Sequence, residues 1–174
     1  TVLQMDGDGQ HQADQLLNLL GPITDGTADI VIGSRYMANT SKTSTTLIRR
    51  IGHRIFSGII LLLSGMKISD PTSGFQGLNK KALALFSRGN FPCDFPDSDV
   101  ILMAKLSGLR IKEVPARMTE RSGGESMHSG LKPIYYGMKM FLSIFIVLLN
   151  SHVWQAWKRE NIKPENPLTN NGSV

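Results

Sequence analysis

The sequence predicts an α/β fold. Two short apolar runs, residues 1–5 and 28–35, have the length and character of buried strands. Apolar residues at helical spacing follow them at 13–20 and at 47–64. Strands that alternate with helices in this way are typical of an open sheet, in which ligands bind at the carboxyl ends of the strands. With 174 residues, of which 41% are apolar, the chain is long enough to bury a sizeable core.

Charge and cysteine content limit the partners and the compartment. The formal net charge of +5 favours anionic partners. Cys93 is the single cysteine, which excludes an internal disulfide and fits a reducing compartment. The sequence also lacks a cluster of cysteine and histidine residues spaced for zinc.

Two carboxylates follow the first predicted strand. Asp6 and Asp8 have only Gly7 between them, and hard carboxylate oxygens suit Mg²⁺ or Mn²⁺. A simple turn also favours Asp and Gly, so the motif alone leaves that alternative open. A calcium-binding loop is excluded, because the sixth and twelfth positions are His11 and Leu17 rather than glycine and glutamate.

The next two elements lead back to the same edge of the sheet. The helix predicted over 13–20 is expected to end at Gly21-Pro22, which is a common stop signal. The second predicted strand, 28–35, ends in Arg35. Because strand ends meet at one rim of an open sheet, we expect Arg35 to emerge on the same rim as Asp6.

The helix predicted over 47–64, which Gly65 closes, lies in a stretch of one charge sign. Residues 30–69 contain no acidic side chain. Arg49 and His53 share one face of the helix, since residues four apart stack along it. The pattern indicates either a solvated helix face or a site for phosphate or anionic lipid, and both readings stay open.

Residues 70–75 form a predicted turn that contains one carboxylate, two hydroxyl groups and a glycine. A helix is predicted after it, from residue 79 or 80 to about 86. An amphipathic helix is predicted over 100–109. Asp97 and Asp99 come just before it, where they suit helix capping as well as a role in chemistry.

A nearly continuous helix is predicted over 131–157. Its purely apolar part is shorter than the roughly 20 residues that span a bilayer, so we expect it to lie on a membrane surface. Flanking basic residues, with Trp154 and Trp157, suit the headgroup layer. Packing on the protein's own sheet or on a partner is the alternative. The polar residues after Lys163 are predicted to be disordered.

The motifs stand in a definite order along the chain. They are Asp6-Gly7-Asp8-Gly9-Gln10-His11, residues 29–36, Asp70-Pro71-Thr72-Ser73-Gly74-Phe75, residues 95–99, and residues 113–115 with 120–126. In this order, over about residues 1–145, the chain resembles the family 2 glycosyltransferases. Within that family it resembles the branch of dolichol-phosphate mannosyltransferase and the bacterial polyprenyl-phosphate sugar transferases.

The resemblance implies a role for each matching residue. Asp6, Asp8 and Gln10 would hold the metal that bridges the nucleotide diphosphate. Arg35 would face the donor and acceptor phosphates, and Asp70 matches the aspartate of the family's D-x-x-[ST]-G-F turn. The residues implied in catalysis are Asp8, Arg35, Asp70 and Arg121. Those implied in substrate binding are Arg35, Arg49, His53, Asp70, Arg121 and Ser126, the last from a loop that closes over the diphosphate.

The implied activity is the inverting transfer of a sugar from a nucleotide-diphosphate sugar to a polyprenyl phosphate, dolichyl or undecaprenyl, with Mg²⁺ or Mn²⁺. Such an acceptor needs no general base, because a phosphate monoester is anionic at neutral pH and attacks the anomeric carbon once positioned. The expected location is cytoplasmic, peripheral on the cytoplasmic face of a membrane. A partner membrane protein or a second copy of the chain is a further expected partner, and nucleic acid is not.

The expected layout has three regions. Residues 1–130 are the C-terminal portion of a GT-A type (Rossmann-like) domain, 131–160 an amphipathic membrane-surface helix, and 161–174 a disordered tail. Family members carry about 80 residues of nucleotide-binding strands ahead of the metal motif, so we expect the chain by itself to be inactive. A non-catalytic membrane-surface module, or an inactive fragment, is the alternative. A processive polysaccharide synthase is disfavoured, because its Q-x-x-R-W motif does not occur.

Overall fold

The computed structural model describes residues 1–7, 9–37, 47–88, 98–117 and 132–162. These residues form the predicted α/β fold around a mixed sheet of strand order β1-β3-β2-β4. The strands are β1 (Val2–Gln4), β2 (Ile30–Ser34), β3 (Gln76–Leu78) and β4 (Ile111–Pro115). The helices are a short 3-10 helix η1 (Ala13–Gln15), α1 (Leu16–Thr24), α2 (Leu47–Ser64), α3 (Lys80–Phe86), α4 (Ser98–Leu106), α5 (Lys132–Leu149) and α6 (Ser151–Asn161).

The strand directions decide which loops meet. β3 runs antiparallel to β1 and to β2, whereas β4 runs parallel to β2. β1, β2 and β4 therefore run the same way, and their carboxyl ends share one edge with the segment that enters β3. Asp6, Arg35 and residues 69–75 all lie at this edge, which confirms that Arg35 and Asp6 share a rim.

β3 and β4 are the two strands that the sequence did not predict. β3 has only three residues, too few for an alternating pattern to stand out. It also contains Gly77, and glycine is a weak strand former. Close packing against α1 nevertheless requires a glycine at this position. A Cβ atom at Gly77 would lie 3.2 Å from the carbonyl oxygen of Leu19 in α1. Pairing with a neighbour on each side makes the segment a strand.

α2 and α3 confirm their predictions. α2 spans Leu47–Ser64 and is followed by Gly65, whose φ of +67° is the left-handed conformation that glycine adopts most easily. α3 begins after Asn79, whose side chain accepts hydrogen bonds from the backbone N–H groups of Lys81 and Ala82.

α1 corrects a prediction, because it continues through Gly21-Pro22 to Thr24. Pro22 cannot donate a helical hydrogen bond, yet Ile23 is buried beside Leu19 against the sheet. The hydroxyl of Thr24 donates to the carbonyls of Leu20 and Gly21, which helps to close the last turn. Burial of the last turn outweighs the local stop signal.

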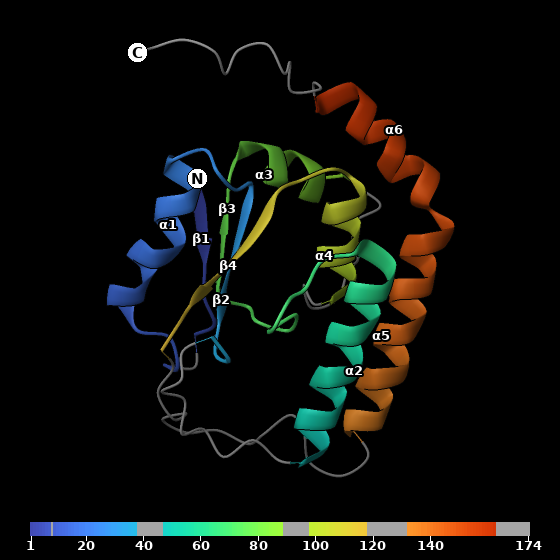
Figure 1. Ribbon diagram of the computed structural model, residues 1–174, viewed down its shortest axis with the longest axis horizontal. Coiled ribbons are helices and arrows are strands. Elements are labelled where there is room, and N and C mark those ends of the chain that lie inside the picture. Colours follow the sequence, from blue (N-terminus) through green and yellow to red (C-terminus); the bar gives the residue numbers. More distant parts are fainter. Residues whose placement is uncertain (8, 38–46, 89–97, 118–131, 163–174) are drawn as a thin grey trace.

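Each face of the sheet carries a hydrophobic core. α1 covers one face, where Val31, Phe75 and Ala116 pack with Leu19 and Ile23. On the other face, α4 lies between the sheet and the helices α2, α5 and α6 (Figure 1). Residues 98–104 of α4 are consequently all buried. A helix forms where one was predicted, but these residues are buried on every side, so the prediction that it is amphipathic is wrong.

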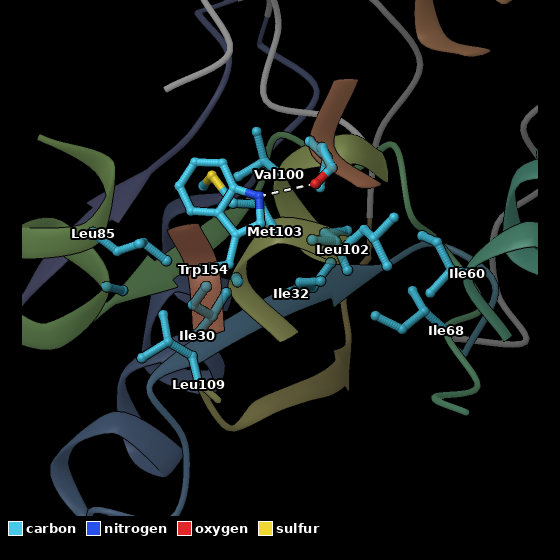
Figure 2. Close-up of a cluster of buried hydrophobic side chains, with 14 of the residues drawn as sticks. Ile30, Ile32, Ile60, Ile68, Leu85, Val100, Leu102, Met103, Leu109 and Trp154 are labelled. Atoms are coloured by element: carbon cyan, nitrogen blue, oxygen red, sulfur yellow. Dashed lines mark hydrogen bonds between the residues drawn. The ribbon is translucent and has the colours of Figure 1, made fainter. Parts of the chain in front are cut away.

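The C-terminal segment forms two helices instead of one. α5 and α6 meet at Asn150 with a bend of 58°. Trp154 and Trp157 are each 2% exposed and belong to the core, so their predicted place among lipid headgroups is wrong. The indole N–H of Trp154 donates to the carbonyl of Val147, 3.0 Å away, within the cluster that Figure 2 shows.

The opposite sides of α2 and α5 remain apolar and exposed. The two helices lie side by side (Figure 1), with the rings of Phe56 and Phe141 5.3 Å apart. Their exposed apolar residues, here called the α2–α5 apolar face, are Ile51, Ile55, Leu61, Leu62, Tyr135, Met138, Phe141, Leu142, Phe145, Ile146 and Leu149. Among the described residues no helix by itself has the length and hydropathy to cross a bilayer, and only α5 and α6 taken together reach them.

Candidate functional site

An arginine and an aspartate form the centre of the site. The guanidinium of Arg35 donates from Nε to Oδ2 of Asp70 at 2.8 Å and from Nη2 to Oδ1 at 2.9 Å. The backbone N–H of Arg35 donates to the same Oδ2 at 3.0 Å. The Asp70 side chain is fully buried, while 19% of the Arg35 side chain remains exposed. The carboxylate therefore holds the guanidinium in one orientation, with an edge toward solvent.

The pair keeps its charges over a wide pH range. Burial alone would raise the pKa of the Asp70 carboxyl, but hydrogen bonds and charge from Arg35 lower this pKa to about 2. Burial would likewise lower the pKa of Arg35, yet the hydrogen bonds and charge of Asp70 raise it above its ordinary value. Asp70 is thus an anion at every physiological pH.

Short contacts tie the turn before β3 to β2. The hydroxyl of Ser73 donates to the carbonyl of Gly33 at 2.6 Å, and the N–H of Gly33 donates to the carbonyl of Phe75 at 2.8 Å. Gly33 has no room for a side chain, since a Cβ atom there would lie 2.4 Å from Cδ1 of Phe75. The predicted turn at 70–75 is therefore seated directly on the strand that carries Arg35.

Glu113 is a site residue that the sequence analysis missed. From β4, its carboxylate accepts hydrogen bonds from the backbone N–H groups of Ser69 and Asp70, both at 2.8 Å. It also accepts from the hydroxyl of Ser69, which in turn lies 2.9 Å from the hydroxyl of Ser34. Glu113 thereby fixes the backbone that presents Asp70. The sequence signal for Glu113 is its place in the motif 113–115, but that motif does not show which groups its carboxylate contacts.

α2 brings His53 to the same place. Its Nε2 lies 3.8 Å from Oδ1 of Asp70, and its ring lies 4.1 Å from the ring of Tyr36. Nε2 is buried and, among the described residues, has no hydrogen-bond partner. Arg49 belongs to the same helix, but its side chain lies outside the described part of the structure.

Asp6 lies on the rim of the site, with 60% of its side chain exposed. Its charge contributes to the raised pKa of Arg35, so the two groups are close enough to interact. His11 Nε2 lies 3.4 Å from Oδ2 of Asp6, and Gly74 faces the same carboxylate. The structure thus brings Asp6, Arg35, Asp70 and His53 to one edge of the sheet.

Other predicted residues are not tested by this geometry. Asp8, Arg121 and Ser126 lie outside the described residues. Gln10 lies within the described residues, two positions after Asp8. Within the described ranges, no three His, Cys, Asp or Glu side chains gather as a metal-binding group.

Asp99 belongs to the helix core. It lies in the first turn of α4, where Oδ1 accepts from the backbone N–H of Val100 and Oδ2 accepts from the hydroxyl of Ser143 in α5. These contacts fit the helix-terminus reading of this residue. Asp97 lies outside the described residues.

Comparison with known proteins connects this geometry to a family. Residues 1–86 match the family described as Glycosyl transferase family 2, and this segment contains Asp6, Arg35, His53 and Asp70. Residues 1–86 belong to glycosyltransferase family 2. The mixed α/β sheet is consistent with part of the family's GT-A domain.

Three relatives of the chain have names that refer to a polyprenyl lipid. The UDP-N-acetylglucosamine–dolichyl-phosphate N-acetylglucosaminyltransferase of Methanococcus voltae is 31% identical over 80% of this chain and 57% of its own length. The undecaprenyl-phosphate mannosyltransferase of Micrococcus luteus is 33% identical over 74% of this chain and 53% of its own. The polyprenol monophosphomannose synthase of Mycolicibacterium smegmatis is 30% identical over 74% and 49%. The chain spans about half the length of these relatives.

Proposed function

We propose that the protein carrying this chain transfers a sugar from a nucleotide-diphosphate sugar to a polyprenyl phosphate at a membrane surface. The observation that supports this most is the meeting of Asp6, Arg35 and Asp70 at one edge of a family 2 glycosyltransferase sheet. The names of the relatives, which include dolichyl, undecaprenyl and polyprenol acceptors, support the acceptor class.

Arg35 is the proposed phosphate ligand. A guanidinium presents a planar set of donors that matches phosphate oxygens, and Asp70 already holds this one in place. Asp70 is fully buried and paired, so its proposed role is to position Arg35. Nε2 of His53 lies 3.8 Å from Asp70 and has no hydrogen-bond partner in the described part of the structure, so it offers a further contact for an acceptor phosphate oxygen.

A divalent cation, Mg²⁺ or Mn²⁺, is part of the proposal. The site fits such a cation in two respects: Asp6 offers exposed hard oxygens, and Gly74 leaves room for its carboxylate. Asp6 would hold the ion with Asp8 and Gln10. When bound, the ion would act as a Lewis acid and neutralise the negative charge that develops on the diphosphate leaving group.

Charge neutralisation is the main task left to the protein's own residues. Arg35, with Arg121 and Ser126 from the loop implied by the family, would stabilise the diphosphate as negative charge develops. The acceptor phosphate is already an anion, so the protein must position it and need not take a proton from it. Arg49 and His53, one turn apart on α2, are the proposed acceptor side of the site.

The α2–α5 apolar face supports action at a membrane. Exposed apolar patches of this kind mark surfaces that bind a membrane or another protein. α2 carries both His53 at the site and Ile51, Ile55 and Leu62 on this face. A lipid phosphate bound near His53 would therefore have apolar surface beside it for its tail. We place this face on the cytoplasmic side of the membrane, with a partner membrane protein or a second copy as further occupants.

The test is sugar transfer by the complete protein to polyprenyl phosphate in vesicles, with Mn²⁺ and labelled nucleotide-sugar. Asp8→Asn is expected to lower transfer about a hundredfold or more, because it removes a metal ligand, and to leave vesicle binding unchanged. Asp14→Asn, an exposed acid in η1, is the matched control and should behave as wild type.

The same measurement separates the alternative. A non-catalytic membrane-surface module would bind vesicles through the α2–α5 apolar face with no dependence of any sugar transfer on Asp8. Unchanged transfer in Asp8→Asn would contradict the enzymatic proposal.

A further inference from the structure

His11 is a buried histidine beside the exposed carboxylate of Asp6. Its residue is 8% exposed, and its Nε2 lies 3.4 Å from Oδ2 of Asp6. Its ring stacks on Phe75, with centroids 4.7 Å apart and planes 19° apart. Phe75 belongs to the core between the sheet and α1. The ring orientation is thus set by the core, and Nε2 is aimed at Asp6.

The hydrogen-bonding pattern favours one tautomer of His11. Nδ1 is buried and has no hydrogen-bond partner among the described residues. A neutral imidazole carries one hydrogen, and placing it on Nε2 lets it be donated to Asp6. The opposite tautomer would bury an unpaired N–H group and leave two acceptors facing each other, which costs more.

Gly74 limits the same carboxylate from the other direction. A Cβ atom at Gly74 would lie 2.8 Å from Oδ1 and 3.1 Å from Oδ2 of Asp6. Gly74 is not among the glycines with positive φ, so the space for Asp6, and not an unusual backbone, is what this position requires. Because the obstructing atoms belong to a flexible side chain, alanine at 74 would displace Asp6 and leave the backbone in place.

We propose that His11 and Gly74 are positioning residues that hold the Asp6 carboxylate ready for a divalent cation. This inference rests on the metal dependence in the proposed function. Neighbours that orient a metal-binding carboxylate strengthen metal affinity, and their loss typically weakens it about 10- to 100-fold. Neither residue is expected to touch the sugar, the nucleotide or the lipid.

The experiment measures Mn²⁺ binding directly, from the free-ion signal in electron paramagnetic resonance. The complete protein is titrated with Mn²⁺, alone and with inorganic pyrophosphate in place of the donor diphosphate. A protein-free titration at the same pyrophosphate concentration accounts for the Mn²⁺ that pyrophosphate binds by itself. His11→Phe keeps an aromatic ring on Phe75 but has no N–H, and we expect the Kd for Mn²⁺ to rise about tenfold. His11→Gln restores an N–H donor at similar reach and should recover part of the affinity.

Gly74→Ala is an independent variant that leaves His11 intact. It should raise the Kd for Mn²⁺ by a similar factor while the melting temperature stays close to that of wild type. The controls are His152→Gln, an exposed histidine on α6, and Gly21→Ala, where a Cβ atom would meet nothing within 4 Å. Both controls should bind Mn²⁺ as wild type does.

The outcomes separate this inference from the proposed function. If Asp6→Asn abolishes Mn²⁺ binding while His11→Phe and Gly74→Ala bind as wild type, the positioning role is overturned and the metal site stands. If wild type does not bind Mn²⁺ even with pyrophosphate, or Asp6→Asn binds equally well, the metal site itself is overturned, and the positioning role with it.

Discussion

At the residue scale, the site depends on two carboxylates in series: Glu113 fixes the backbone of Asp70, and Asp70 fixes the guanidinium of Arg35. Glu113 accepts from the backbone N–H of Asp70, and Asp70 accepts from three nitrogens of Arg35: the backbone N, Nε and Nη2. Two anions therefore support one guanidinium at the end of β2. Such an arrangement makes Arg35 rigid before a phosphate arrives, which reduces the ordering that binding would otherwise require.

The pH dependence of folding tests this network. In the folded protein the pKa of the Asp70 carboxyl is about 2, below its ordinary value of 3.8, so its ionisation stabilises the folded state above about pH 4. That stabilisation, about 2 kcal/mol, is lost as the pH falls through 2. We expect Asp70→Asn to lower the free energy of unfolding by at least about 2 kcal/mol at pH 7, and the difference from wild type to shrink between pH 4 and pH 2.

Urea unfolding of both proteins over this pH range is the measurement. Asp29 also has a lowered pKa: burial raises it, but hydrogen bonds from Arg110 and Asn79 prevail. Because Asp29 is present in both proteins, its effect cancels in the difference. A difference that stays constant from pH 7 to pH 2 would contradict the assignment to Asp70.

At the element scale, α4 and α6 show how tertiary packing changes the meaning of a residue type. Trp154 and Trp157 lie near basic side chains and were predicted to reach lipid headgroups. In the structure they belong to the same core cluster as Ile30, Met103 and Leu109 (Figure 2). α6 therefore packs against α4 and α5 as part of the protein's own core.

A pair of substitutions tests the role of α6. Trp154→Ala removes a large buried side chain and its hydrogen bond to Val147, and should lower the free energy of unfolding by about 3–5 kcal/mol. Leu142→Ala, on the exposed side of α5, should change it by less than about 0.5 kcal/mol. Denaturant unfolding measures both, and a small effect of Trp154→Ala would place α6 outside the core.

At the scale of the whole molecule, the two sides of the sheet serve different purposes. α1 covers one face with a small core, while α2, α3, α4, α5 and α6 all contribute to a larger core on the other (Figure 1). The apolar surface left over is concentrated on the outside of the helices that build this larger core. The proposed orientation at a membrane follows from this asymmetry.

Vesicle binding tests the orientation. Leu62 and Phe145 are 84% and 56% exposed, so Leu62→Glu with Phe145→Glu should weaken binding to anionic vesicles about tenfold or more without lowering the melting temperature. Leu17→Glu is the matched control, because Leu17 is 71% exposed on α1, across the sheet. Sedimentation with vesicles measures both. Equal loss of binding in the control, or none in the double variant, would contradict the proposed orientation.

Several features of the fold and site were predictable from local sequence. β2, α2 and α3 have strong periodic or capping signals, and the rim shared by Asp6 and Arg35 follows from strands that end in those residues. The network around Asp70 was not predictable, because Glu113 lies 43 residues from Asp70 and no local pattern encodes which backbone N–H its carboxylate meets. β3 was missed for the same reason: three residues become a strand only through their neighbours.

The sequence by itself determined the α/β class, the acidic and basic residues of the sheet rim, and the family resemblance, because these depend on residue type and order. Only the tertiary structure decided that Asp70 is buried and holds Arg35, that His11 faces Asp6, and that the tryptophans of α6 lie in the core. Burial and long-range hydrogen bonds arise between segments far apart in the chain, and local propensity carries no information about them.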